Sequence, residues 1–143
     1  MLFILNLFST LFLTGLIWTI QIVHYPLFSF VGKSEFIDYH SAHSARISWI
    51  VIPLMLIELF STFLHSIYDS FDNKILNYTG IFFVLVVWFS TFLLSVPEHN
   101  ILGNGWNKES IQRLVNTNWI RTIAWTLHSF LLIYELIGKL YTK

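Results

Sequence analysis

Four stretches of mostly apolar residues are the feature that most constrains this chain. They run over residues 2–23, 45–67, 79–96 and 118–140. An α-helix needs about 20 such residues to cross the ~30 Å hydrocarbon core of a bilayer. Hydrophobic residues make up 55 % of the 143 residues and charged residues 11 %, whereas a soluble domain has about 25 % charged residues. The sequence therefore predicts one all-α integral membrane domain with four spans.

The connections between these spans differ in length. Residues 24–44 and 97–117 are long and polar, whereas residues 68–78 form a short turn. Four consecutive spans place both long connections on the same side of the membrane. We therefore expect an up-down four-helix transmembrane bundle with two long loops on one face, each partly helical, with Ser34 and Asn107 as candidate N-caps. The first stretch lacks a basic leader and a small-x-small cleavage site, so we expect a span rather than a signal peptide.

Charge and cysteine content exclude several kinds of partner and site. Eight basic and eight acidic residues give a formal net charge of zero. Binding to nucleic acid needs a basic excess, so no nucleic-acid partner is expected. Cysteine is absent, which excludes disulfides, thiolate metal ligands and cysteine nucleophiles. The cations are spread evenly over the two sides of the predicted spans, so the orientation in the membrane is not determined.

Each predicted span carries most of its polar side chains on one helical face. In the last span, Arg121, Trp125, His128 and Glu135 fall within a narrow sector at 100° per residue. A charged group at the bilayer centre costs at least ~2.5–3.5 kcal/mol, so these faces should point into the bundle. At 1.5 Å per residue, Glu58 reaches a depth similar to that of His128. We expect the two to pair, directly or through water, and to relay protons; the alternative is that they only hold helices together.

Histidines gather at one predicted end of the bundle. Four of the six histidines lie there, and we predict them as ligands of a transition metal such as Fe, Cu or Zn: His24, His40, His43 and His99. Glu98 would be a further ligand or a general base. Two alternatives stay open: interfacial histidines bonded to loop carbonyls, and histidines that bind a substrate or act in acid–base catalysis. Haem between two facing histidines is a less favoured cofactor.

Two arginines open the second and fourth spans and remain protonated. Arg46 and Arg121 either neutralise the carboxylates of Glu98 and Glu58 or clamp an anionic head group such as a carboxylate, phosphate or phenolate. The second possibility predicts an amphiphilic substrate whose polar end lies at the rim and whose tail lies between the helices.

Tryptophans would complete such a site. Trp106 and Trp125 would form apolar walls for the substrate, although tryptophans in such chains often only anchor the membrane interface. The expected partners are membrane lipid and a hydrophobic or amphiphilic small molecule, and a homo-oligomer is left open. The rival functions are a non-enzymatic accessory or lipid-binding protein and, in an oligomer, a proton channel at the level of Glu58.

Two segments of the second half carry a resemblance to known proteins. Residues 97–102, Pro-Glu-His-Asn-Ile-Leu, and residues 114–122, Leu-Val-Asn-Thr-Asn-Trp-Ile-Arg-Thr, resemble small four-span bacterial membrane proteins of the anthrone-oxygenase-like family. That family has a Pro-x-Asn-x-x-Leu-type segment after its third span and a Trp, His and Arg cluster at its fourth. The resemblance implies an oxygenase or oxidoreductase acting on a hydrophobic phenolic substrate. We therefore expect a metal-dependent protein of the bacterial inner membrane.

Overall fold

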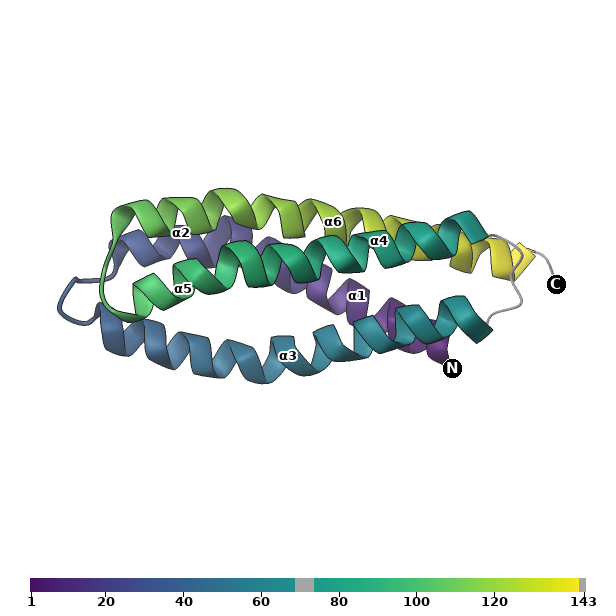
Figure 1. The fold of residues 1–143 in the computed structure, drawn as a ribbon, viewed down its shortest axis with the longest axis horizontal. Coiled ribbons are helices and arrows are strands. Elements are labelled where there is room, and N and C mark those ends of the chain that lie inside the picture. The colour runs from purple at the N-terminus through teal and green to yellow at the C-terminus, as the bar shows by residue number, and fades with distance from the viewer. Residues whose placement is uncertain (69–73, 142–143) are drawn as a thin grey trace.

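A computed structural model, which describes residues 1–68 and 74–141, consists of four long helical rods. The rods span Leu2–Phe30, Phe36–Tyr68, Lys74–Gly103 and Lys108–Tyr141, and each is long and apolar enough to cross a membrane. Helices suit lipid because every backbone polar group is satisfied within the segment. The rods run alternately up and down along one axis (Figure 1). This confirms the predicted all-α, up-down four-helix bundle.

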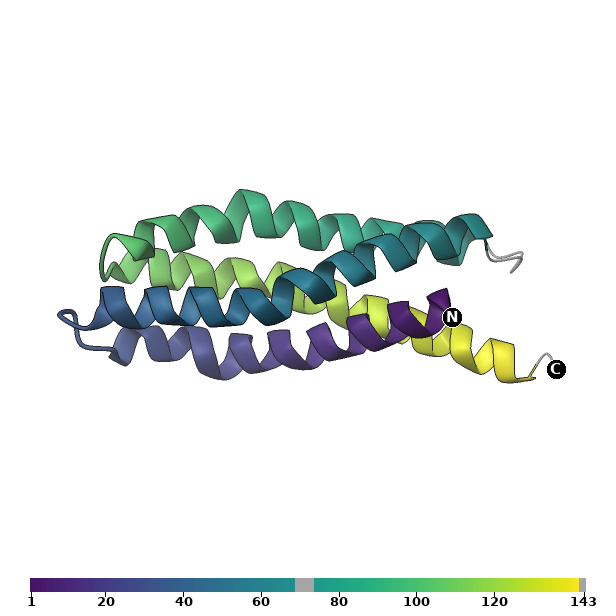
Figure 2. The same ribbon diagram turned by 90° about the horizontal axis from the view of Figure 1, so that it is seen from below.

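The two ends of the bundle differ. Residues 31–35 and 104–107 connect rods at one end, which we call the histidine end (Figures 1 and 2). Met1 and the last turn of α6 (Lys108–Tyr141) lie at the opposite end, which we call the terminal end. Of the predicted short turn at 68–78, residues 69–73 lie outside the described residues, whereas Tyr68 ends the second rod and residues 74–78 begin the third as helix.

The rods extend well beyond the predicted spans at the histidine end. α3 (Phe36–Tyr68) starts nine residues before the predicted 45–67 span, and α6 starts ten residues before the predicted 118–140 span. The two long loops are therefore mostly helix, and the connections are short. Asn107 caps α6 as expected, because its Oδ1 accepts the backbone N–H of Ser110 at 2.9 Å.

The first and third rods pass a proline without ending. The first consists of α1 (Leu2–Thr19), a π turn η1 (Ile20–His24), α2 (Tyr25–Leu27) and a 3-10 turn η2 (Phe28–Phe30). The third consists of α4 (Lys74–Ser90), a π turn η3 (Thr91–Ser95) and α5 (Val96–Gly103). Proline lacks an N–H and clashes with the preceding turn, and each π turn ends two residues before one, Pro26 or Pro97. The third rod thus continues past its predicted end at residue 96.

Buried polar side chains occur along the whole interior of the bundle, and a group of large apolar side chains lies at the histidine end. Phe28, Phe36, Leu102 and Leu114 are fully buried there. Nearer the terminal end, buried polar side chains from several rods face one another, among them Thr10, Glu58, Thr62, His65, His128 and Glu135. The outer surface is made of large apolar side chains. This is the inward arrangement of polar faces that the cost of burying charge in lipid predicts.

Candidate functional site

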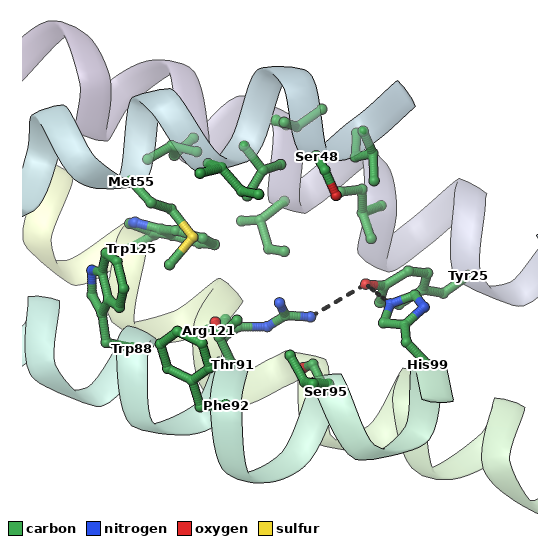
Figure 3. Close-up of a pocket in the computed structure, with 18 residues that line it drawn as sticks. Tyr25, Ser48, Met55, Trp88, Thr91, Phe92, Ser95, His99, Arg121 and Trp125 are labelled. Carbon is green, nitrogen blue, oxygen red and sulfur yellow. Dashed lines mark hydrogen bonds between the residues drawn. The ribbon is translucent and has the colours of Figure 1, made fainter. Parts of the chain in front are cut away.

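An apolar pocket of about 360 Å³ lies between all four rods, toward the histidine end (Figure 3). This volume is within the usual range for small-molecule sites, about 300–1,000 Å³. Its walls are mostly aliphatic and aromatic. Met55, Trp88 and Trp125 lie at one end of the pocket, and Tyr25 and His99 lie at the other (Figure 3). The pocket therefore has an apolar end and a polar end.

Arg121 is the charged group of this pocket. It is only 6 % exposed, and its side chain lies between the two ends with the guanidinium directed toward Tyr25 (Figure 3). The guanidinium donates to the Tyr25 hydroxyl at 3.4 Å and to Asn118 Oδ1. Its Nε has no hydrogen-bond partner, and Arg121 forms no salt bridge in the part of the chain that the structure describes. A buried guanidinium without a carboxylate partner is costly, because its charge is not compensated.

Two further polar atoms of pocket-lining residues also lack a hydrogen-bond partner among the described residues. Ser95 Oγ and Trp88 Nε1 are buried and have no hydrogen-bond partner among the described residues. Ser95 belongs to η3, so the π turn before Pro97 places its hydroxyl at the pocket. Buried polar atoms in proteins are nearly always hydrogen-bonded. The residues that line the pocket thus include three with an unpaired donor, Trp88 and Ser95 of the third rod and Arg121 of the fourth.

The pocket reaches the outer surface of the bundle. Ile52 of α3, Phe92 of η3 and Val96 of α5 line it and are also 55 %, 57 % and 39 % exposed. Ile52 lies near the middle of a rod of 33 residues. At 1.5 Å per residue that rod is ~50 Å long, so the opening lies at the depth of the hydrocarbon core. The opening therefore faces lipid rather than water.

The four predicted histidines do come together, as two pairs. His24 Nε2 lies 2.8 Å from His43 Nδ1, and His40 Nε2 lies 3.0 Å from His99 Nδ1. The ring centroids of His43 and His99 are 6.3 Å apart, so the pairs are neighbours. His99 also contacts the Tyr25 hydroxyl through Nε2 at 3.1 Å. A hydrogen-bonded chain thus runs from Arg121 through Tyr25 and His99 to His40.

These histidine contacts bear on the predicted metal site. Within residues 1–68 and 74–141, no group of three or more His, Cys, Asp or Glu side chains is arranged to hold a metal ion. Metal ligation by the four histidines stays a prediction.

Glu98 makes a different contact from either of those expected. Both of its carboxylate oxygens accept from Arg113, at 2.7 and 3.1 Å. Arg113, rather than Arg46 or Arg121, is therefore the arginine that pairs with Glu98. Glu98 sits one residue before His99, but on α5 this turns its side chain toward α6. Sequence reasoning did not consider Arg113 as its partner.

Glu58 and His128 form the predicted pair, directly and fully buried. His128 Nδ1 lies 3.2 Å from Glu58 Oε1. Glu58 also accepts the Thr10 hydroxyl at 2.9 Å and the Trp125 indole N–H at 2.9 and 3.1 Å. The first and fourth rods thus supply hydrogen-bond partners to one carboxylate of the second rod, which offsets the cost of burying it. Because Trp125 also lines the pocket, this pair lies directly behind the pocket wall.

Two of the predicted substrate-binding residues are not at the pocket. Arg46 is exposed and lines a separate, more open depression with His24 and His43. Trp106 does not line the pocket; its ring lies 4.7 Å from the Lys33 ammonium. Conversely, Tyr25 and Ser95 are pocket residues that the sequence reasoning did not select. Tyr25 precedes Pro26 directly and Ser95 lies two residues before Pro97, so a nearby proline is the signal that sequence reasoning could have used.

No family model, curated protein or solved structure matches this chain. The resemblance to anthrone-oxygenase-like proteins therefore stays a prediction.

Proposed function

We propose that this chain is a membrane protein that binds an amphiphile with an anionic oxygen head group, either a carboxylate or a phenolate, drawn laterally from the lipid bilayer. The observation that carries the proposal is Arg121, buried at the pocket wall with its Nε unpaired and without a carboxylate partner in the described chain. A charged head group beside Arg121 would compensate the guanidinium charge.

The polar end of the pocket suits an oxygen head group. Arg121 has only donors, and Ser95 Oγ can donate as well. Charge-assisted hydrogen bonds to a carboxylate are about twice as strong as neutral ones. The Tyr25 hydroxyl and the His99 ring beside them can exchange a proton with a phenol. The same residues would therefore serve acid–base chemistry on the head group.

The apolar end and the lateral opening suit the rest of the ligand. Met55, Trp88 and Trp125 offer an apolar surface for a ring or chain. The opening beside Ile52, Phe92 and Val96 faces the hydrocarbon core, so a tail can remain partly in lipid. A molecule that is already dissolved in the membrane reaches this pocket without crossing water. The bacterial inner membrane is the location that the resemblance implies.

Fluorescence quenching tests this proposal. Bromine-tagged medium-chain fatty acid and the matched bromine-tagged alcohol are titrated into detergent-purified protein, and quenching of Trp88 and Trp125 reports occupancy of the pocket. The acid should bind about 10- to 100-fold more tightly than the alcohol, the difference that a charge-assisted hydrogen bond of ~1.5–3 kcal/mol makes. A bromine-tagged alkyl phenol and its methyl ether form a second pair for the phenolate case.

One matched pair of variants isolates the guanidinium. Arg121→Gln should abolish the preference for the acid. Arg113→Gln removes an arginine from the same helix that is exposed and bound to Glu98, so the preference should persist. Equal binding of acid and alcohol by the wild-type protein, or a preference that survives Arg121→Gln, would refute the proposal.

The histidine pairs support a second candidate function, in which Fe, Cu or Zn binds beside the pocket and drives oxidoreductase or oxygenase chemistry on the amphiphile. Two imidazoles on one cation, each bound at ~2.0–2.1 Å, have nitrogens about 3–3.5 Å apart. The facing nitrogens of the two pairs are 2.8 and 3.0 Å apart. Small ring movements would convert each hydrogen bond into shared ligation. Glu58 and His128 would then relay protons behind the pocket, and Glu98 would serve as a base only after leaving Arg113.

A further inference from the structure

A second internal cavity lies below the Glu58–His128 pair, toward the terminal end. It has a volume of about 10 Å³, which is the minimum for one water molecule. It is lined by polar side chains of all four rods: Asn6, Thr62, His65, Asn77, His128 and Glu135. A site for an internal water needs two to four polar partners, and this cavity supplies them.

One atom points to what this cavity holds. His128 is 1 % exposed, and its Nε2 has no hydrogen-bond partner among the described residues. Its other ring nitrogen, Nδ1, is engaged by Glu58. Imidazole at a buried position normally has both nitrogens paired. The unpaired nitrogen and the polar lining together indicate a water molecule bonded to Nε2.

The far side of the cavity connects to the terminal end of the bundle. His65 Nε2 lies 2.8 Å from Glu135 Oε1, and the same oxygen lies 2.9 Å from Lys139 Nζ. His65 lines the cavity and also lines an open depression at the surface, together with Phe3, Tyr68 and Lys139. His65 and its partner Glu135 therefore stand between the outside and the buried water site.

We propose that these groups form a water-bridged path that carries protons between the terminal end of the bundle and Glu58. A proton held by Glu135 passes to the internal water, which gives one of its own protons to His128 Nε2. His128 then releases the proton on Nδ1 to a Glu58 oxygen, and the reverse sequence returns it. Each step breaks one O–H or N–H bond and forms another, so no other reactant is needed.

Two titratable groups of the described chain, His65 and Lys139, contact Glu135 at the outer end of the path. The ionisable side chains that face it are Glu58 and His65 of α3 and His128, Glu135 and Lys139 of α6. The side chains from α1 and α4 are Asn6, Thr10 and Asn77, which do not titrate. The path ends behind Trp125, so it serves the pair at the pocket wall from one side of the membrane only. This inference does not depend on which ligand the pocket binds.

Gly80 offers a way to block the water site. A Cβ added at Gly80 would lie 3.4 Å from His128 Nε2, which is a tolerable contact, and it would occupy space beside the unpaired nitrogen. Gly80→Ala should therefore displace the water without disturbing the rods. Gly15→Ala is the matched control, because a Cβ there meets nothing within 4 Å.

Nuclear magnetic resonance of protein with ¹⁵N-labelled histidine tests the path. The His128 signal is assigned from the His128→Gln spectrum, and magnetisation exchange with bulk water is measured at that ring. The wild-type protein and Gly15→Ala should exchange readily, whereas Gly80→Ala should slow exchange at least about tenfold. Glu135→Gln, which keeps the shape of the side chain, should slow it as well. Absence of exchange at His128 in the wild type, or equal exchange in Gly80→Ala, would overturn the proposal.

Discussion

The indole nitrogen of Trp125 donates to both carboxylate oxygens of Glu58, at 3.1 and 2.9 Å, and ties the wall of the pocket to the buried pair behind it. Four residues earlier on the same helix, Arg121 presents its guanidinium to the pocket. α6 thus carries a cation on the pocket side and a donor to an anion on the other side. A substitution of Arg121 or of Trp125 should therefore affect the surroundings of the other residue.

Trp125→Phe tests this link through stability. The variant leaves a fully buried carboxylate with one donor fewer, so the free energy of unfolding should fall by about 1–3 kcal/mol. Reversible unfolding in mixed detergent micelles measures the change. Trp88→Phe is the control, because the Trp88 indole nitrogen has no hydrogen-bond partner among the described residues, so its removal should cost less. Equal losses in the two variants would contradict the role given to the Trp125 hydrogen bond.

Val96→Trp tests lateral access to the pocket. Val96 stands at the opening, so a larger side chain should slow association and dissociation of a bromine-tagged fatty acid by a similar factor and leave the dissociation constant nearly unchanged. Stopped-flow quenching measures both rates. Leu93→Trp serves as control, since Leu93 is 67 % exposed and does not line the pocket. If Val96→Trp leaves both rates unchanged, the ligand enters the pocket by a route other than the opening beside Val96.

Pro97→Ala tests the π turn. Alanine restores a backbone N–H, so residues 91–97 can close into an ordinary α turn and rotate the following helix. His99 would then leave Tyr25 and His40, and affinity for the anionic ligand should fall about tenfold, the value of one hydrogen bond to a charged group. Pro53→Ala in α3, which has no adjacent π turn, should bind normally. Unchanged affinity in Pro97→Ala would mean that the turn does not position the site.

Elemental analysis tests the second candidate function. If the histidine cluster binds a transition metal, the purified protein should carry a stoichiometric amount, and the double variant His43→Ala/His99→Ala should lose it. His65→Gln should retain it, because His65 belongs to the terminal end. Optical absorption of the same sample separates haem from other metals. If the wild-type protein contains only trace metal, the second candidate function is refuted, and ligand binding without a metal remains as the proposed function.

Depth along the helices explains what could be predicted from the sequence. Lipid forces Glu58 and His128 inward, and their distances from the predicted helix starts place them at the same level. The same reasoning would have paired His65 with Glu135, which lie 29 and 27 residues from the first residues of α3 and α6 (65 − 36 and 135 − 108). The gathering of the histidines followed from the up-down order of the spans.

Rotation about the helix axis explains what could not be predicted. Each π turn inserts an extra residue into its rod, which changes the direction of every later side chain. Glu98 therefore faces Arg113 instead of the histidine cluster. Arg46 is expected near the start of a span. It lies instead ten residues into α3, which begins at Phe36, on a face of the helix that leaves its side chain exposed.

The most direct measurement is the ¹⁵N resonance of Arg121 Nε, assigned from the Arg121→Gln spectrum. A medium-chain fatty acid should shift this resonance in a saturable manner, whereas the matched alcohol should not, and the Arg113 resonance should stay in place. An Arg121 Nε resonance that responds to neither compound, or equally to both, would contradict the claim that this guanidinium receives an anionic head group.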